Sequence, residues 1–346
     1  MITLEKLGTS SLQLEKKSKE PSNLFSRRFL QLSLGSIWIL DAFLQLQPYM
    51  LNTNFLPQSL LSSAAMLPSI LREPIYIMQD IVAAHIIFWD LLLAIVQFVI
   101  GIGIIWPRTT KIALAISVVW AVSIWYGGEG MGGIFAKGAS VFFGAPGAAL
   151  LYAVLALIIW PKNIEGKTLI EASLVPSIIS RGIWMTIWIG GAFLPLLPWN
   201  SPYGVMKYNF LSLPHSEPKW LVLLDRNFES FSLAYCNEIT IFLLLVMVLI
   251  GINIAMDVNP KLWVKISIFF SVISWVLGQN FGGIFTGQGT DINSAPILIL
   301  FALTFYPIGR SFSDSRTSSF GLSRWLANDN LKFFSATYEK IRKVLI

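Results

Sequence analysis

Charged residues are scarce in this sequence. Only 13% of its 346 residues are Asp, Glu, Lys or Arg, and 55% are hydrophobic, whereas an average soluble domain is about 25% charged. A soluble chain of this composition would leave much apolar surface in contact with water. A membrane-crossing helix needs about 20 mostly apolar residues, and such runs recur along the sequence. We therefore expect an all-α integral membrane protein that contacts the lipid bilayer.

Cysteine and histidine are also rare. The single cysteine, Cys236, excludes an internal disulfide, a Cys-x-x-Cys redox relay and iron–sulfur ligation within the chain. The two histidines, His85 and His215, are too few for two bis-histidine haems. No zinc-binding, Walker or dinucleotide-binding pattern occurs in a suitable context. We expect no metal site and no covalently bound cofactor.

Eight apolar runs predict eight transmembrane helices. They cover roughly 29–50, 82–106, 112–127, 145–160, 182–198, 233–256, 262–278 and 295–309. The segments 1–28, 107–111, 161–181, 257–261 and 310–346, together with Lys265, hold 20 of the 25 Lys and Arg residues. This positive-inside asymmetry predicts a plasma-membrane protein with cytoplasmic N- and C-termini. The basic residues form no single face, so nucleic acid is not an expected partner.

The two ends of the chain are basic. Residues 1–28 lead into an apolar run without a small-residue cleavage site, which is typical of an uncleaved anchor. In the 310–346 tail, apolar and basic residues alternate from Leu322 onward. This pattern predicts an amphipathic helix on the anionic inner leaflet; a disordered basic tail is the alternative.

The sequence matches itself at an offset of 150 residues. The matched pairs include Trp38 with Trp188, Pro48 with Pro198, Gly101 with Gly251, Lys111 with Lys261, Trp125 with Trp275, Gly132 with Gly282 and Pro146 with Pro296. Because each copy holds an even number of helices, both copies cross the membrane in the same sense. We expect two tandem, parallel four-helix repeats, 29–160 and 182–309, joined by a cytoplasmic linker, 161–181.

A glycine-rich segment follows the third helix of each repeat. The pairs Gly128 with Gly132 and Gly278 with Gly282 allow close helix packing. The segments themselves are too apolar for ordinary loops, and irregular backbone at membrane depth must be covered by protein or line a watery cavity. We expect them to be partly re-entrant at the outer surface.

The four-helix unit resembles a known family. The first helix, from Trp38 to Pro48, and the glycine-rich segment from Gly127 to Pro146 are similar to those of DoxX/DoxD-type membrane proteins. That family includes the large membrane subunit of thiosulfate:quinone oxidoreductase. The resemblance implies a tandemly duplicated membrane subunit that interacts with a quinone, with the redox cofactor on a partner subunit. No catalytic motif of the family can be transferred to this chain.

Ionisable residues within membrane helices indicate functional sites, because their burial is costly. Asp41, His85, Asp90 and Glu129 all fall in the outer half of the first repeat, and we predict that they form one polar cluster. The aligned positions of the second repeat are Gly191, Tyr235, Thr240 and Gln279. The second repeat is uncharged there, so we expect a single site in the first.

Helical spacing adds candidate ligand contacts. Trp38, Asp41 and Gln45 lie on one stripe of the first helix, and Asp90 shares a face with Gln97. Carboxyl groups removed from water hold protons and can carry them. The alternative is that Asp41 and Asp90 only fix helix packing through hydrogen bonds, and that His85 and Glu129 have structural or interfacial roles.

Polar residues also precede the eighth helix. Asn293 and Ser294 come just before Pro296, an order typical of a helix start, because the side-chain oxygen accepts from a free backbone N–H and proline suits the first turn. We predict a helix cap there.

Three functions fit the sequence. The first is a DoxX/DoxD-like redox subunit, an oxidoreductase component whose polar cluster contacts a quinone. The second is a proton-coupled carrier of a small solute that uses Asp41 and Asp90. The third is an assembly subunit without chemistry of its own.

Overall fold

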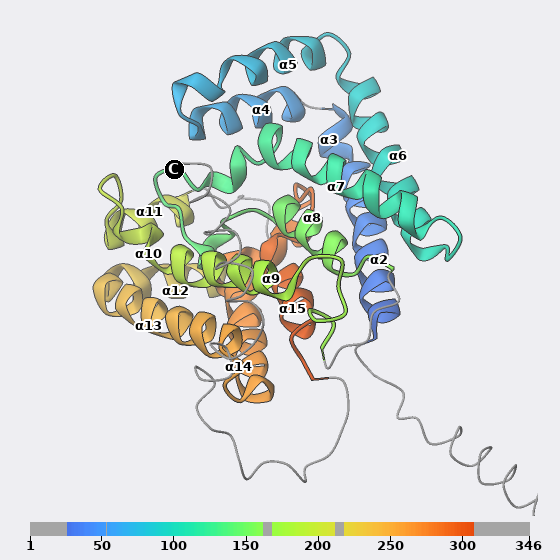
Figure 1. Cartoon of the computed structure of the whole chain (residues 1–346). Helices are drawn as coiled ribbons and strands as arrows, with labels where there is room; N and C mark the ends of the chain where they lie inside the picture. Colours follow the sequence, from blue (N-terminus) through green and yellow to red (C-terminus); the bar gives the residue numbers. More distant parts are fainter. Residues whose placement is uncertain (1–25, 53, 162–167, 212–217, 308–346) are drawn as a thin grey trace, which may run out of the picture.

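The computed structural model describes residues 26–52, 54–161, 168–211 and 218–307 (Figure 1). In these residues the chain forms helices joined by turns, with no strand. The all-α prediction is therefore confirmed for the described part. The tail for which an amphipathic helix was predicted, His215 and nearly all of the basic N-terminal segment lie outside the described residues.

Seven α-helices lie between residues 26 and 160 of the described chain. They are α2 (Arg27–Gln45), α3 (Pro48–Asn52), α4 (Phe55–Met66), α5 (Glu73–Ala83), α6 (Ile86–Ile105), α7 (Thr110–Gly127) and α8 (Ala148–Ile158). The segment between α7 and α8 contains two short 3₁₀ turns, η2 (Met131–Gly133) and η3 (Val141–Phe143). We call these helices and turns, with η1 (Ser69–Leu71) between α4 and α5, the first half.

The second half begins inside the predicted linker 161–181. Its helices are α9 (Ser177–Met185), α10 (Gly191–Phe193), α11 (Pro202–Leu211), α12 (Lys219–Ala234), α13 (Cys236–Ala255), α14 (Pro260–Ile273) and α15 (Ser294–Leu303). Short turns complete it: the π-helical η4 (Thr186–Gly190) and η6 (Ser274–Gly278), and the 3₁₀ turns η5 (Leu194–Leu196) and η7 (Asn280–Thr286).

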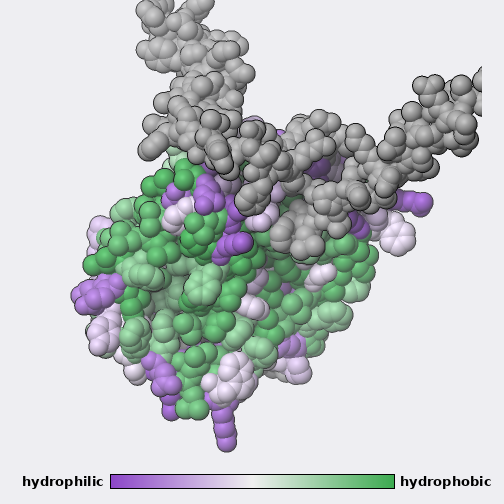
Figure 2. All heavy atoms as spheres, turned by 90° about the horizontal axis from the view of Figure 1, so that it is seen from below, coloured by the Kyte–Doolittle hydropathy of each residue, from purple (hydrophilic) through white to green (hydrophobic). Residues whose placement is uncertain are grey.

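Five helical segments of the described chain are long and apolar enough to cross a membrane. They are Ile86–Ile105, Thr110–Gly127, Ser177–Leu196, Cys236–Ala255 and Pro260–Gly278, close to five of the eight predicted runs. Only 28–33% of each is buried inside the protein, so their remaining apolar surface needs lipid. Figure 2 shows a largely hydrophobic face with few hydrophilic side chains. Membrane association explains this surface.

The other three predicted runs differ from full-length spans. The helix α2 has 19 residues, but its arginines, glutamines and Asp41 lower its hydropathy. The helices α8 and α15 have only 11 and 10 residues, which cover about 15 Å at 1.5 Å per residue, half of the roughly 30 Å hydrocarbon layer. Each follows an irregular glycine-rich segment, 128–147 or 279–293, and most of its residues are buried.

Helix α8 packs against α15 at the centre of the molecule, and α2 packs along α6 at its edge (Figure 1). The α2–α6 contact is close because both helices present glycine. A Cβ on Gly101 would lie 2.6 Å from the carbonyl oxygen of Gly35, too close for any side chain. This pair therefore lets the two backbones touch, as lipid-embedded helices require.

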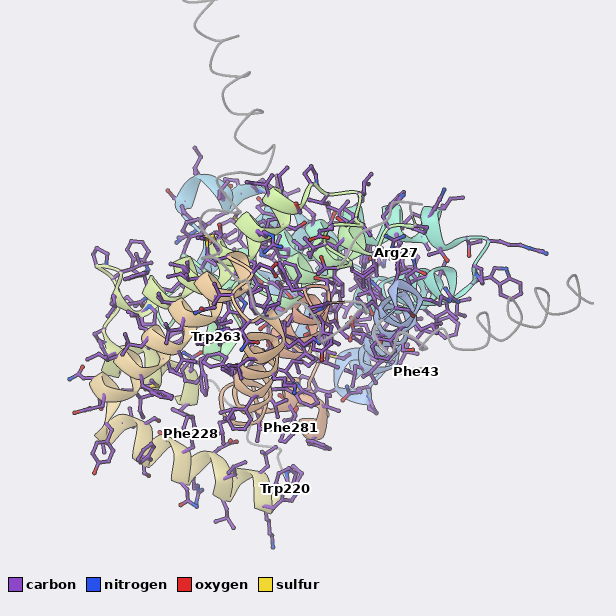
Figure 3. All side chains as sticks on the ribbon, turned by 60° about the horizontal axis from the view of Figure 1, so that its bottom comes forward. Arg27, Phe43, Trp220, Phe228, Trp263 and Phe281 are labelled. Carbon is purple, nitrogen blue, oxygen red and sulfur yellow. The ribbon has the colours of Figure 1, made fainter. Side chains whose placement is uncertain are left out.

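Helical hairpins lie beyond the ends of the long helices. Helices α4 and α5 pack together in the first half, and α11 and α12 in the second. Figure 3 places Trp220 of α12 beside Phe281 of η7, with ring centroids 6.1 Å apart. The hairpins thus cover the segments 128–147 and 279–293, which we call the glycine-rich end of the molecule.

Candidate functional site

Asp41 is buried near the glycine-rich end of α2, with 1% of its surface exposed. Its Oδ2 accepts a hydrogen bond of 2.8 Å from the hydroxyl of Tyr152 on α8, and its Oδ1 has no hydrogen-bond partner. The edge of Trp38 packs on the Tyr152 ring, with centroids 4.8 Å apart. The Trp38 indole donates to Ser117 of α7 over 2.9 Å. Three helices therefore fix the position of the Asp41 carboxyl group.

Glu129 follows α7 and reaches the N-terminus of α8. Its Oε1 accepts from the backbone amide of Ala149 over 3.0 Å, as a carboxylate does at a positive helix end. Its Oε2 is buried without a partner. Gly147 has φ of +96°, and a Cβ there would lie 2.1 Å from Oε2. Glycine is therefore required where the carboxyl group approaches the chain.

Asp291 of the second half belongs to the same cluster. Its Oδ1 accepts from the amide of Asn293 over 2.6 Å and its Oδ2 from the Thr290 hydroxyl over 3.1 Å. It interacts electrostatically with both Glu129 and Asp41. We call Asp41, Glu129, Tyr152 and Asp291 the carboxyl cluster. Its members come from both halves of the chain.

Burial changes the protonation of Glu129. Loss of solvent is the main cause that raises its pKa to about 8, and the negative charge of Asp291 adds to it, while the amides of Ala149 and Ala148 oppose it. Burial also raises the pKa of Asp291, against the hydrogen bonds from Asn293 and Thr290. Neither residue lies in a membrane-crossing helix. The pair therefore holds a proton near neutral pH.

Glu129→Gln is expected to flatten the pH dependence of stability. Because the pKa of Glu129 is about 8 in the folded protein and ordinarily 4.5, the wild type is stabilised by this group below pH 4.5 and loses that stability as the pH rises to 8. Thermal unfolding in detergent at pH 5.5 and pH 8.5 measures the effect. The melting temperature of the wild type should fall more than that of Glu129→Gln. Equal falls would contradict the assignment.

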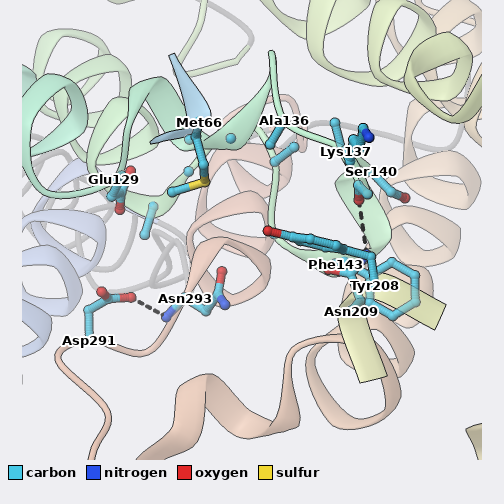
Figure 4. Close-up of a pocket in the computed structure, with 18 residues that line it drawn as sticks. Met66, Glu129, Ala136, Lys137, Ser140, Phe143, Tyr208, Asn209, Asp291 and Asn293 are labelled. Atoms are coloured by element: carbon cyan, nitrogen blue, oxygen red, sulfur yellow. Dashed lines mark hydrogen bonds between the residues drawn. The ribbon is translucent and has the colours of Figure 1, made fainter. Parts of the chain in front are cut away.

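A cavity of about 320 Å³ adjoins the cluster. Glu129, Asp291 and Asn293 lie on one side of it, and Tyr208 and Asn209 of α11 on the other (Figure 4). Much of the remaining wall is glycine or alanine from 132–148, with Met66 of α4 and Lys137 also contributing. Both hairpins and both halves therefore meet at this cavity.

The predicted polar cluster is brought together only in part. Asp41 and Glu129 lie in the carboxyl cluster. Asp90 is fully buried on α6 and accepts a hydrogen bond of 2.9 Å from Gln45 of α2. This polar contact between α2 and α6 is separate from the carboxyl cluster. Gln97 is buried on the same helix. His85 is exposed at the start of α6, in a separate surface hollow.

Two members of the carboxyl cluster, Tyr152 and Asp291, were not predicted from the sequence as site residues. Tyr152 is the one hydroxyl-bearing residue within α8, and that polar group in an apolar helix was the available signal. Asn293 and Ser294 before α15 were predicted to cap that helix, and Asn293 does cap it through a 2.6 Å hydrogen bond from the Ser294 amide to its Oδ1. Asp291 orders that cap and also interacts electrostatically with Glu129.

Among the described residues of the second half, the position that aligns with Asp41 cannot hold a carboxyl group, for a steric reason. Gly191, which aligns with Asp41, has no room for a side chain because a Cβ there would lie 2.3 Å from Val141. Phe142 fills the adjoining space, against Phe228 and Phe270. Val141, next to this aromatic core, therefore occupies the place that the Asp41 side chain holds in the first half.

No family model matches the chain, and no curated protein or solved structure matches it significantly.

Proposed function

We propose that this chain is a proton-coupled carrier of a small solute, with the carboxyl cluster as its proton site. The observation that supports this most is that Glu129 and Asp291, one from each half, meet at a polar cavity beside the buried Asp41. Carriers built from repeats place substrate and ion sites at the junction of the repeats. A proton gained or lost there alters the contact between the halves.

The proposal includes eight crossings in two tandem repeats, with both termini in the cytoplasm of a plasma-membrane protein. On this view α8 and α15 are the membrane-embedded parts of the fourth and eighth crossings, and the glycine-rich segments that precede them lie at the outer surface beneath the hairpins. Such half-length helices direct their N-termini at sites within the protein, and irregular backbone is tolerated there because protein covers it.

Matching hydrogen bonds support the two repeats. Trp125 donates to the Pro146 carbonyl over 2.8 Å, and Trp275 donates to the Ile292 carbonyl over 2.9 Å. The acceptors are 146 residues apart, four fewer than the offset of the sequence comparison. Thus the two glycine-rich segments are held by the same tryptophan-to-carbonyl hydrogen bond but differ in length.

The residues that meet the two half-length helices also match. The Ala149 amide donates to Glu129, and the Ala295 amide donates to Gln279, both over 3.0 Å. In the second half the position is held by a neutral amide, which further donates to Ser274 and Ser294. One scaffold therefore carries a titratable group in the first half and a permanently neutral group in the second.

A DoxX/DoxD-like redox subunit is the second candidate. The Tyr152 hydroxyl, the Asp41 carboxyl group and the Trp38 ring form one array, and quinone reduction needs proton donors of this kind. A partner subunit would then carry the redox cofactor.

Currents on a solid-supported membrane distinguish these candidates. Proteoliposomes of the purified chain are exposed to a jump from pH 8.5 to pH 6.5, with and without mixtures of small amines, amino acids, organic acids and sugars. The carrier proposal expects a transient charge displacement with protein, none in empty liposomes, and a changed time course with one mixture. No displacement under any mixture, together with quinone reduction by the co-purified complex, would favour the redox subunit.

A further inference from the structure

The cavity beside the carboxyl cluster has a distinctly acidic side. Glu129 and Asp291 line it, and Asn293 lies between them and the opposite wall (Figure 4). Asp291 already accepts two hydrogen bonds, whereas Oε2 of Glu129 is buried and has no partner. Beyond the amides of Ala149 and Ala148, the Glu129 carboxyl group therefore has the capacity to accept a further hydrogen bond.

Two residues that line the cavity, Asn293 and Gly138, carry oxygens that already accept one hydrogen bond each and can accept a second. Gly144 has φ of +116°, and a Cβ there would lie 2.8 Å from Oδ1 of Asn293. Gly138 presents its carbonyl to Asn209 over 2.9 Å. Acceptor groups of this kind suit a ligand that donates hydrogen bonds, and they repel an anion.

The charged groups around Glu129 and Asp291 also favour a cationic ligand over an anion. Asp41 of α2 and Tyr152 of α8 lie on its buried side, and Tyr208 of α11 lies across the cavity. Lys137 is the one cationic side chain among the described residues that line the cavity, and it is exposed. The field at Glu129 is therefore negative when the carboxyl groups are ionised.

We infer that the cavity binds a small organic cation, a primary ammonium, beside the carboxyl groups of Glu129 and Asp291, in competition with a proton. This inference rests on the proposed carrier function and names its substrate class. The ammonium pairs with the Glu129 carboxylate as the proton leaves for bulk water. One positive charge enters and one leaves, so the net charge of the site is unchanged. Cation and proton then compete for one site, and this competition couples their movements.

Propylammonium chloride is the probe, and sodium propionate is the anion of similar shape. Isothermal titration calorimetry on the purified chain in nanodiscs at pH 7 measures binding, and an indicator dye in weak buffer measures protons released. We expect propylammonium to bind with release of about one proton per cation, and propionate not to bind. Binding should weaken at pH 6, where the pair holds its proton more fully.

Variants locate the site. Glu129→Gln should weaken propylammonium binding at least about tenfold, because it removes a charge-assisted hydrogen bond, and Asp291→Asn serves as the second variant if that chain folds poorly. Lys137→Gln should tighten binding. Glu238→Gln, which changes an exposed carboxylate on α13, should leave binding unchanged.

Three results would overturn the inference: no propylammonium binding by the wild type between pH 6 and pH 9, binding without proton release, or preference for propionate. If the pH-jump displacement persists while propylammonium fails to bind, the substrate class is wrong and the carrier proposal stands. If both are absent, both are wrong.

Discussion

Gly132→Ala is expected to prevent stable folding, whereas Gly133→Ala is expected to be tolerated. The two glycines are neighbours with the same φ of +65°, so alanine pays the same conformational cost at each, about 1–2 kcal/mol. They differ in the space around them. A Cβ on Gly132 would lie 1.7 Å from the carbonyl oxygen of Pro146, but a Cβ on Gly133 would be 3.5 Å from the nearest atom, the Met66 sulfur.

The Pro146 carbonyl cannot move freely, because it accepts the indole hydrogen bond of Trp125. Gly132→Ala must therefore break that bond or shift the start of α8, at a total cost of more than about 4 kcal/mol. Yield of monodisperse protein and thermal unfolding in detergent measure the difference. A Gly132→Ala chain as stable as Gly133→Ala would show that the glycine-rich segment does not pack against α8 as described.

Asp41→Asn is expected to reduce the pH-jump charge displacement several-fold, and Asp90→Asn is expected to leave it near the wild-type value. Both aspartates are buried on neighbouring helices, and each accepts one side-chain hydrogen bond, from Tyr152 or Gln45, that asparagine can also accept. Only Asp41 interacts electrostatically with Glu129 and Asp291. The two variants therefore share a chemical change and differ in their link to the carboxyl cluster.

Unfolding temperatures of both variants within a few degrees of the wild type would establish that the fold is retained. Equal loss of displacement in both would move the proton site to the α2–α6 contact. No loss in Asp41→Asn would remove Asp41 from the proton-exchanging group.

Hydropathy predicted most helices of the described chain because lipid-facing residues make long apolar runs. It could not predict that α8 and α15 are short. The segments before them are also apolar, and only the positive φ values of residues such as Gly132 and Gly282 break the helix there. These values depend on backbone packed nearby, which composition does not reveal.

The site was predictable where it depends on one helix. The stripe of Trp38, Asp41 and Gln45 is buried on α2 as its spacing indicated. The link from Asp41 to Tyr152 joins residues 111 positions apart, and Glu129 meets Asp291 across the two halves. Such contacts are set by tertiary packing, so helical spacing could not supply them. The same packing leaves His85 outside the cluster.

The charge displaced by a pH jump in Glu129→Gln tests the central claim most directly, because the claim is that protons bind where the two halves meet. Gln279 holds the matching position with the same hydrogen bond to its helix, so the fold should accept glutamine at residue 129. The account predicts that Glu129→Gln loses most of the displacement between pH 8.5 and pH 6.5, while Glu238→Gln keeps it. A folded Glu129→Gln chain with the full wild-type displacement would contradict the account.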